Sequence, residues 1–296
     1  MRILLTGAGG QLGWELRRSL APFGDLVAAD RHRVDLADRD GVRRAVRELA
    51  PRVIVNAGAH TAVDRAESEP DLAMAVNGVG PGILAEEARR LGAAIVHFST
   101  DYVFDGAKPG AYVEEDATAP LSVYGRTKLA GEEAIQATGA FHLILRTSWV
   151  YGVRGVNFLR TVCRLAAERP ELRMVDDQTG APTWTRMIAE ATAQVIAAET
   201  ARRGHPLFAE TGGVYHLTAR GSTTWCGFAR AILARGAAFG VSGAPRLVPI
   251  RSAEYPTAAR RPLNSVLSNA KLERVFGLAL PAWDESLRLC AEEAQR

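Results

Sequence analysis

The chain has 296 residues, of which 47% are hydrophobic and 23% charged, as in a folded globular enzyme with a large core. Its formal net charge is only +3, and the basic residues are scattered singly or in pairs, which excludes the basic patch of a nucleic-acid-binding protein. No apolar run approaches the length of a membrane span, so we expect no membrane partner.

The three cysteines, Cys163, Cys226 and Cys290, are odd in number and widely spaced. This pattern favours reduced thiols over a disulfide framework or a metal site. Met1 is followed at once by the strand-like segment that begins at Arg2, without the pattern of a signal peptide. We therefore expect a cytoplasmic protein.

The first half of the chain alternates short apolar runs with amphipathic stretches. Strands are predicted at residues 3–6, 26–29, 53–56, 94–99 and 142–146. Helical spacing of apolar residues predicts helices over 11–20 and 39–49, the second with Asp38 as its N-cap. Strands that are apolar along their length and alternate with helices indicate a Rossmann-type α/β fold, a doubly wound parallel sheet covered on both faces.

After about Trp149, glycine, proline and polar residues become more frequent, and helices over 187–200 and 224–237 are separated by irregular segments. We expect residues 1–150 to form the dinucleotide-binding domain, completed by elements around 184–220. Residues 151–183 and 221–296 would form a smaller C-terminal substrate-binding region.

Three glycines follow the first predicted strand and open the first helix: Gly7, Gly10 and Gly13. Glycine permits the tight turn, the close approach of a pyrophosphate to the backbone, and the packing of helix on strand. The positive end of the helix dipole then faces the phosphates. This position in the chain favours a dinucleotide site over a ligand-free turn.

Asp30 ends the second predicted strand, where a carboxylate can bind the adenosine ribose hydroxyls of NADH. Arg31 and Arg33 follow directly and could instead bind the 2′-phosphate of NADPH, or simply lie in a solvated turn. The sequence leaves the choice between NADPH and NADH open.

Tyr124 and Lys128 are spaced i and i+4, on one face of a predicted helix. Six tyrosines and three lysines would give about 0.06 such pairs by chance. A lysine ammonium can lower the pKa of a tyrosine, and such a tyrosine can donate a proton to a ketone during hydride transfer. Thr100, at the end of the fourth predicted strand, could polarise the same carbonyl or merely stabilise a turn.

Taken together, these residues resemble the extended short-chain dehydrogenase/reductase superfamily and, within it, the dTDP-4-dehydrorhamnose reductase family. The resemblance runs nearly the whole chain and rests on the segments 10–16, 53–57, 59–64, 99–104, 123–125, 127–132, 146–151, 177–183 and 259–265. Gly58 and Phe98 depart from the family, where alanine and tyrosine are commoner, but neither change removes a catalytic group.

The resemblance implies reduction of the C4 ketone of a nucleotide sugar, dTDP-4-dehydro-L-rhamnose, with NADPH or NADH. Tyr124 would donate the proton, assisted by Lys128 and Thr100. The expected cofactor contacts are Gly7, Gly10, Gln11, Leu12, Gly13, Asp30, Asp35, Leu36, Ala59, His60, Thr61, Phe98, Tyr124 and Lys128. The expected contacts to the sugar nucleotide are Thr100, Asp101, Trp149, Arg260 and Arg261, since guanidinium groups suit a diphosphate.

Some members of the family are homodimers that bind Mg²⁺ through glutamates at the interface. Glu15 matches one of these positions and the others have no secure match, so we assign no metal ligand and leave Mg²⁺ and the dimer open. Two other functions fit the shared motifs: a nucleotide-sugar epimerase that retains its NAD, and a regulatory subunit resembling the methionine adenosyltransferase beta subunit. The intact Thr100, Tyr124 and Lys128 favour the reductase.

Overall fold

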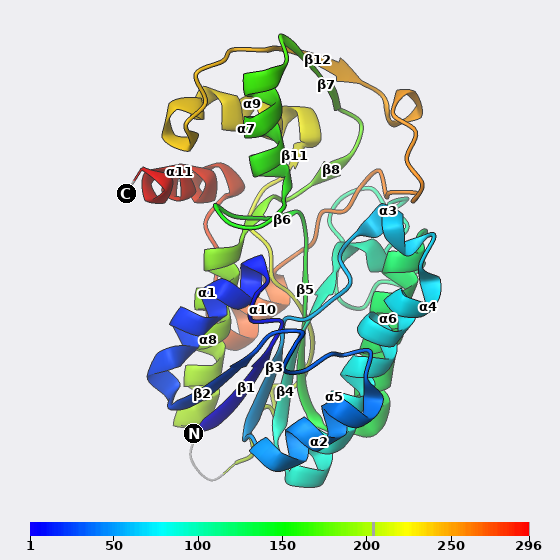
Figure 1. Ribbon diagram of the computed structural model, residues 1–296, viewed down its shortest axis with the longest axis vertical. Helices are drawn as coiled ribbons and strands as arrows, with labels where there is room; N and C mark the ends of the chain where they lie inside the picture. Colours follow the sequence, from blue (N-terminus) through cyan, green and yellow to red (C-terminus); the bar gives the residue numbers. More distant parts are fainter. Residues whose placement is uncertain (203–204, 296) are drawn as a thin grey trace.

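The computed structural model describes residues 1–202 and 205–295. A six-stranded, entirely parallel sheet in the order β10-β5-β4-β3-β1-β2 forms its centre (Figure 1). Its strands are β1 (Arg2–Thr6), β2 (Asp25–Ala29), β3 (Val53–Asn56), β4 (Ala94–Thr100), β5 (Phe141–Thr147) and β10 (Gly213–His216). The five strands predicted from the first half are confirmed to within one residue at each end, because each is a short apolar run buried on both faces.

Helices cover both faces of this sheet (Figure 1). Alternate strand residues face opposite sides: Leu5 and Val55 lie in the core beneath one helical layer, and Leu4 and Ile54 in the core beneath the other. The first layer contains α1 (Gln11–Leu20), α8 (Thr185–Ala201) and α10 (Ala270–Phe276). The second contains α2 (Arg39–Leu49), α5 (Gly80–Leu91) and α6 (Val123–Thr138).

The predicted starts of the first two helices are confirmed. Helix α1 spans Gln11–Leu20, and α2 begins after Asp38, whose carboxylate accepts a hydrogen bond from the backbone N–H of Gly41 at 3.0 Å. The second layer also holds α3 (Val63–Ala66), α4 (Pro70–Met74) and a π-helical turn, η2 (Ala75–Val79).

Above the carboxyl ends of the strands lies a smaller cluster of helices and two-stranded sheets (Figure 1). Its helices are α7 (Phe158–Glu168), α9 (Trp225–Ala234) and α11 (Trp283–Ala294). Its short sheets pair β6 (Val150–Tyr151) with β9 (Thr183–Trp184), β7 (Glu171–Val175) with β12 (Arg246–Ile250), and β8 (Thr179–Gly180) with β11 (Thr223–Thr224). Four short 3₁₀ turns complete the order of elements among the described residues: η1 (Ala21–Phe23), η3 (Asp101–Val103), η4 (Gly236–Phe239) and η5 (Ser252–Glu254).

The strand order reverses between β1 and β3, which lie side by side although β2 separates them in the sequence. In an open parallel sheet, ligands bind beyond the carboxyl ends of the strands at such a reversal. The described residues contain no helix that is both long and apolar enough to span a membrane.

Candidate functional site

Two of the three glycine positions in the loop after β1 cannot be occupied by any other residue. Gly7 has a φ of +68°, and a Cβ atom there would lie 2.4 Å from the backbone nitrogen of Gly58. A Cβ atom at Gly13 would lie 2.1 Å from the carbonyl oxygen of Gly7. Gly10 is the N-cap of α1 and has no side chain to occupy the first-turn N–H groups. These groups are therefore available to an anion such as a pyrophosphate.

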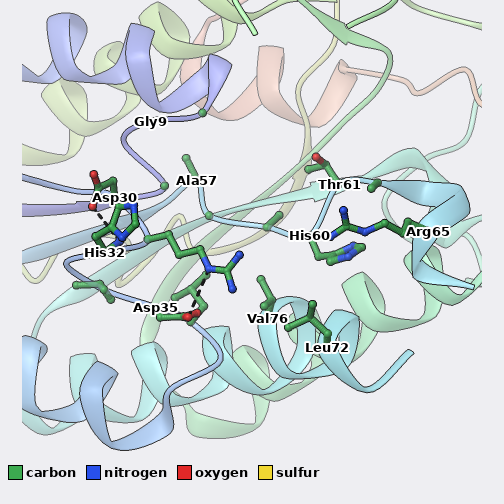
Figure 2. Close-up of a pocket in the computed structure, with 18 residues that line it drawn as sticks. Gly9, Asp30, His32, Asp35, Ala57, His60, Thr61, Arg65, Leu72 and Val76 are labelled. Carbon is green, nitrogen blue, oxygen red and sulfur yellow. Dashed lines mark hydrogen bonds and ion pairs between the residues drawn. The ribbon is translucent and has the colours of Figure 1, made fainter. Parts of the chain in front are cut away.

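A cavity of about 550 Å³ opens beside this loop (Figure 2). Eight of the predicted cofactor residues line it: Gly7, Gly10, Asp30, Asp35, Leu36, Ala59, His60 and Thr61. Arg31, considered above for the 2′-phosphate of NADPH, also lines it, together with nine residues that were not predicted: Gly9, His32, Val34, Ala57, Gly58, Ala62, Arg65, Leu72 and Val76. The volume, the glycine-lined floor and the adjoining helix N-terminus fit the adenosine and phosphate end of a dinucleotide.

The rim of the cavity beyond β2 carries both charges that the sequence indicated. Asp30 accepts hydrogen bonds through Oδ1 from the backbone N–H groups of His32 (3.0 Å) and Arg33 (3.2 Å). Arg31 lies 3.5 Å from Asp35, and both side chains line the cavity, whereas Arg33 is not among the lining residues. The rim thus presents a carboxylate and a guanidinium to the ribose position, and both cofactors remain compatible with it.

His60 is held in the cavity wall by Asn77, a residue that was not predicted from the sequence. Asn77, from the π-helical turn η2, accepts a hydrogen bond from the backbone N–H of His60 at 2.8 Å and donates one to its carbonyl at 3.0 Å. The His60 ring lies 3.2 Å from Glu69. No periodicity marks Asn77, since its role depends on contacts between segments distant in the sequence.

The remaining predicted cofactor residues lie outside this cavity: Gln11, Leu12, Gly13, Phe98, Tyr124 and Lys128. The side-chain amide of Gln11 donates to the carbonyl of Val150 at 3.4 Å, so it connects the glycine loop to the smaller cluster. Leu12 packs against the core beneath α1. Phe98 accepts a hydrogen bond from Lys128 through its main-chain carbonyl, at 2.6 Å.

The predicted proton donor lies where α6 passes the end of β4. Ser122 caps α6 by accepting a hydrogen bond from the N–H of Gly125 at 3.2 Å, and a Cβ atom at Gly125 would lie 2.2 Å from the carbonyl oxygen of Tyr102. This close approach brings the ring of Tyr124 to 5.9 Å from that of Tyr102, edge to face. The hydroxyl group of Thr100, the last residue of β4, acts to lower the pKa of Tyr124.

Burial has the largest effect on the pKa values of Tyr124, Lys128 and Asp101. It raises the pKa of Tyr124 to about 12, despite the opposing effect of Thr100, and it lowers the pKa of the buried Lys128 to about 8. Burial also raises the pKa of Asp101 to about 7, although the nearby hydroxyl groups of Ser265 and Thr100 favour its charged form. In the protein without its cofactor, burial thus outweighs the lowering of the Tyr124 pKa that the sequence led us to expect from Lys128.

Trp149, predicted to contact the sugar nucleotide, lies between β5 and β6 in a conformation that depends on Trp225 and Gly180. Its φ is +47°, and its ring stacks on Trp225 with centroids 3.6 Å apart and planes 4° apart. A Cβ atom at Gly180 would lie 2.4 Å from the Trp149 ring. Gln178 accepts a hydrogen bond from the indole N–H of Trp225 at 3.1 Å. Trp225 was not predicted, because it lies 76 positions after Trp149 in the sequence.

The two arginines expected at the diphosphate have different surroundings. Arg261 donates two hydrogen bonds to the carboxylate of Asp64, at 2.7 and 3.2 Å, and its burial is intermediate. Arg260 is exposed. Asp101 is buried, and within the described residues its Oδ2 has no hydrogen-bond partner.

Glu15, the position that resembles a magnesium ligand, is already paired with two guanidinium groups of this chain. Its carboxylate lies 2.8 Å from the guanidinium of Arg18 and 3.5 Å from that of Arg186, which also pairs with Glu293. Across the described residues, no group of three or more His, Cys, Asp or Glu side chains is placed to hold a metal ion. The residues around Glu15 within one chain therefore do not fit a divalent cation.

Comparisons with known proteins identify the family of this chain. The family model described as the RmlD substrate binding domain matches residues 1–296. A dTDP-4-dehydrorhamnose reductase of Burkholderia thailandensis is 50% identical over 99% of each chain. Among solved structures, a dTDP-4-dehydrorhamnose reductase of Clostridium acetobutylicum is 37% identical with a TM-score of 0.91 over 100% of both chains. That of Bacillus anthracis, in complex with NADP, is 34% identical with a TM-score of 0.88 over 99% of both. The chain belongs to the RmlD substrate-binding family of Rossmann-type reductases.

Proposed function

We propose that this protein reduces the C4 ketone of dTDP-4-dehydro-L-rhamnose to give dTDP-L-rhamnose, with NADPH or NADH as the reductant. One observation carries the assignment: Tyr124, Thr100 and Asp101 converge at the end of β4, in a chain that is 50% identical to a dTDP-4-dehydrorhamnose reductase. The nucleotide-sugar specificity is supported by those relatives.

The bound nicotinamide would supply a hydride to the carbonyl carbon. The residues of this chain have to provide the proton and the orientation. With a pKa raised to about 12, Tyr124 is protonated at neutral pH and can donate its phenolic proton to the developing alkoxide oxygen. Thr100 would hydrogen-bond the same oxygen, and Lys128 would contact the nicotinamide ribose.

The smaller cluster would bind the nucleotide sugar over this group. Trp149 would pack against the sugar, and Asp101 would bind a hydroxyl group through its unpaired Oδ2. Arg260 suits the diphosphate because its guanidinium is exposed, whereas Arg261 is occupied by Asp64. A cytoplasmic location is a further expectation that follows from the cysteine pattern, and the family resemblance leaves a homodimer open.

The test is to offer a panel of nucleotide-linked 4-keto sugars and follow NAD(P)H absorbance. We expect one cofactor to be oxidised for each dTDP-4-dehydro-L-rhamnose consumed. Turnover without net consumption of added NAD(P)H would identify an epimerase, and the absence of turnover would favour a regulatory subunit.

Replacing the proton donor tests the mechanism within this function. We expect Tyr124→Phe to retain cofactor affinity and to lower kcat by about two to four orders of magnitude, the usual contribution of a positioned general acid. Steady-state kinetics and a cofactor titration measure both effects. Turnover within a few-fold of the wild type would remove Tyr124 from the mechanism.

A further inference from the structure

A row of buried polar side chains from three neighbouring strands ends at Lys128. Thr6 on β1 donates to Oδ1 of Asn56 on β3 at 2.6 Å, and Nδ2 of Asn56 lies 2.9 Å from Nδ1 of His97 on β4. Nε2 of His97 in turn lies 3.2 Å from Nζ of Lys128. All four side chains are at most 2% exposed. The proton transfer described above uses neither Asn56 nor His97.

The orientation of the Asn56 amide is fixed by its neighbours. The backbone N–H of Gly58 can only donate, and it lies 3.1 Å from the same amide atom that accepts from Thr6. That atom must therefore be the oxygen, and the other must be the NH₂ group. Because an amide NH₂ only donates, Nδ1 of His97 has to accept.

This assignment fixes the tautomer of His97. Burial holds the pKa of His97 well below its ordinary value, so the ring is neutral and carries one proton. With Nδ1 accepting, the proton is on Nε2 and points at the Lys128 nitrogen. An ammonium group has no lone pair with which to accept this N–H, whereas an amine has one.

We propose that Asn56 and His97 act as positioning residues that favour the amine form of Lys128 over its ammonium form in the cofactor-free protein. The amine accepts the N–H of His97, donates one proton to the carbonyl of Phe98, and keeps one N–H for a bound ligand. Only this last N–H depends on the proposed function, through the expected ribose contact.

The other titratable groups around Lys128 do not reverse this preference for the amine form. Glu132, on the same helix, favours the ammonium form, but its carboxylate already accepts hydrogen bonds from Arg146 and Ser99. Tyr124, one helical turn earlier, has a pKa of about 12 and is uncharged at neutral pH. Burial works in the same direction as His97 and lowers the pKa of Lys128 to about 8.

The chain offers a direct measurement because it contains only three lysines, Lys108, Lys128 and Lys271. We would label lysine with ¹³C and ¹⁵N and follow the side-chain NMR signals of the cofactor-free protein against pH. Lys108→Arg and Lys271→Arg assign the two other signals. We expect Lys128 to titrate about two pH units or more below both, and titration of all three lysines together would overturn the proposal.

The decisive variant is Asn56→Asp, because the side chain of aspartate has nearly the same shape as that of asparagine. A carboxylate accepts the proton of Nδ1, so Nε2 of His97 becomes an acceptor that favours the ammonium form of Lys128. We expect the pKa of Lys128 to rise by about one unit or more. His97→Gln, which can still present an N–H to Lys128, should stay near the wild type.

The added charge of Asn56→Asp could also act on Lys128 without His97, and a double-mutant cycle with His97→Leu separates the two effects. An equal rise of the Lys128 pKa with and without His97 would overturn the role of the tautomer. If these variants fail to fold, the ¹⁵N shifts of the His97 ring in the wild-type protein decide, since a proton on Nδ1 contradicts the proposal. None of these measurements involves substrate, so their outcome is independent of the reductase activity.

Discussion

The carboxylate of Asp30 both stabilises the turn after β2 and lines the cavity. Its Oδ1 stabilises the turn after β2 by accepting from the backbone of His32 and Arg33, while Oδ2 remains available to a ribose hydroxyl. Arg31, on the same rim, is close to Asp35. A 2′-phosphate would meet repulsion from Asp30 and attraction from Arg31, so we expect the protein to use both NADH and NADPH.

Removing the charge of Asp30 should increase the affinity for NADPH relative to that for NADH. We expect Asp30→Asn to lower the ratio of the Kd for NADPH to that for NADH by about tenfold, which corresponds to about 1.4 kcal/mol of relieved repulsion. Asparagine keeps an oxygen for the turn, and Asp30→Ala shows the added effect of losing it. Isothermal titration with both cofactors measures the ratio. An unchanged ratio in both variants would mean that Asp30 does not face the ribose.

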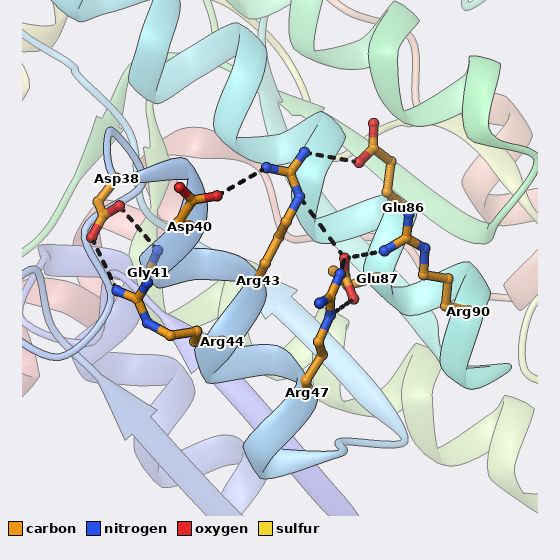
Figure 3. A network of polar contacts seen from close by, with 9 residues as sticks. All are labelled: Asp38, Asp40, Gly41, Arg43, Arg44, Arg47, Glu86, Glu87 and Arg90. Atoms are coloured by element: carbon orange, nitrogen blue, oxygen red, sulfur yellow. Dashed lines mark hydrogen bonds and ion pairs between the residues drawn. The ribbon is translucent and has the colours of Figure 1, made fainter.

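At the scale of elements, α2 is joined to α5 by an ion-pair network around one buried carboxylate (Figure 3). Glu87 is 1% exposed and accepts two hydrogen bonds from Arg47 and one from Arg90, each at 2.8 Å. Hydrogen bonding by Arg47 lowers the pKa of Glu87 below its ordinary value, against the effect of burial.

We expect Glu87→Gln to lower the free energy of unfolding by about 1.5–3 kcal/mol, the usual range for hydrogen bonds to a charged group. Because the folded-state pKa is depressed, this contribution is full above the unfolded pKa of about 4.3 and is lost as the pH falls through the folded value. Urea denaturation from pH 8 to pH 3 measures it. Glu86→Gln is the matched control, since that exposed side chain meets Arg43 at 3.4 Å and should matter little. Equal effects of the two variants would contradict the prediction.

The elements that the sequence predicted are those with a strong local signal. The five apolar strands and helices α1 and α2 have regular periodicity or a capping residue, and the structure places them within one residue of expectation. The two-residue strands β6, β8, β9 and β11 and the π-helical turn η2 were not predicted, because such segments are too short to repeat a periodic pattern. The same limit hid Asn77 and Trp225, whose partners are distant in the sequence.

At the scale of the whole molecule, the surroundings of Glu15 bear on metal dependence. Within one chain, Arg18 and Arg186 already pair with the carboxylates of Glu15, Glu190 and Glu293. We therefore expect EDTA to leave kcat/KM and the mass in solution unchanged within error. Light scattering and steady-state kinetics, with and without added Mg²⁺, provide the measurement. A loss of activity or a change of mass that Mg²⁺ restores would show that a second chain completes a metal site here.

The sheet also ties distant parts of the chain together, since β10 lies beside β5 although some sixty residues of other elements separate them in the sequence. A ribosome adding roughly 5–20 residues per second needs several seconds to reach β10 after completing β5. Throughout that interval the growing polypeptide presents an unpaired strand edge rich in leucine and isoleucine, the kind of surface on which nascent chains aggregate. Demand for chaperones should therefore peak during translation and fall once residue 216 has emerged.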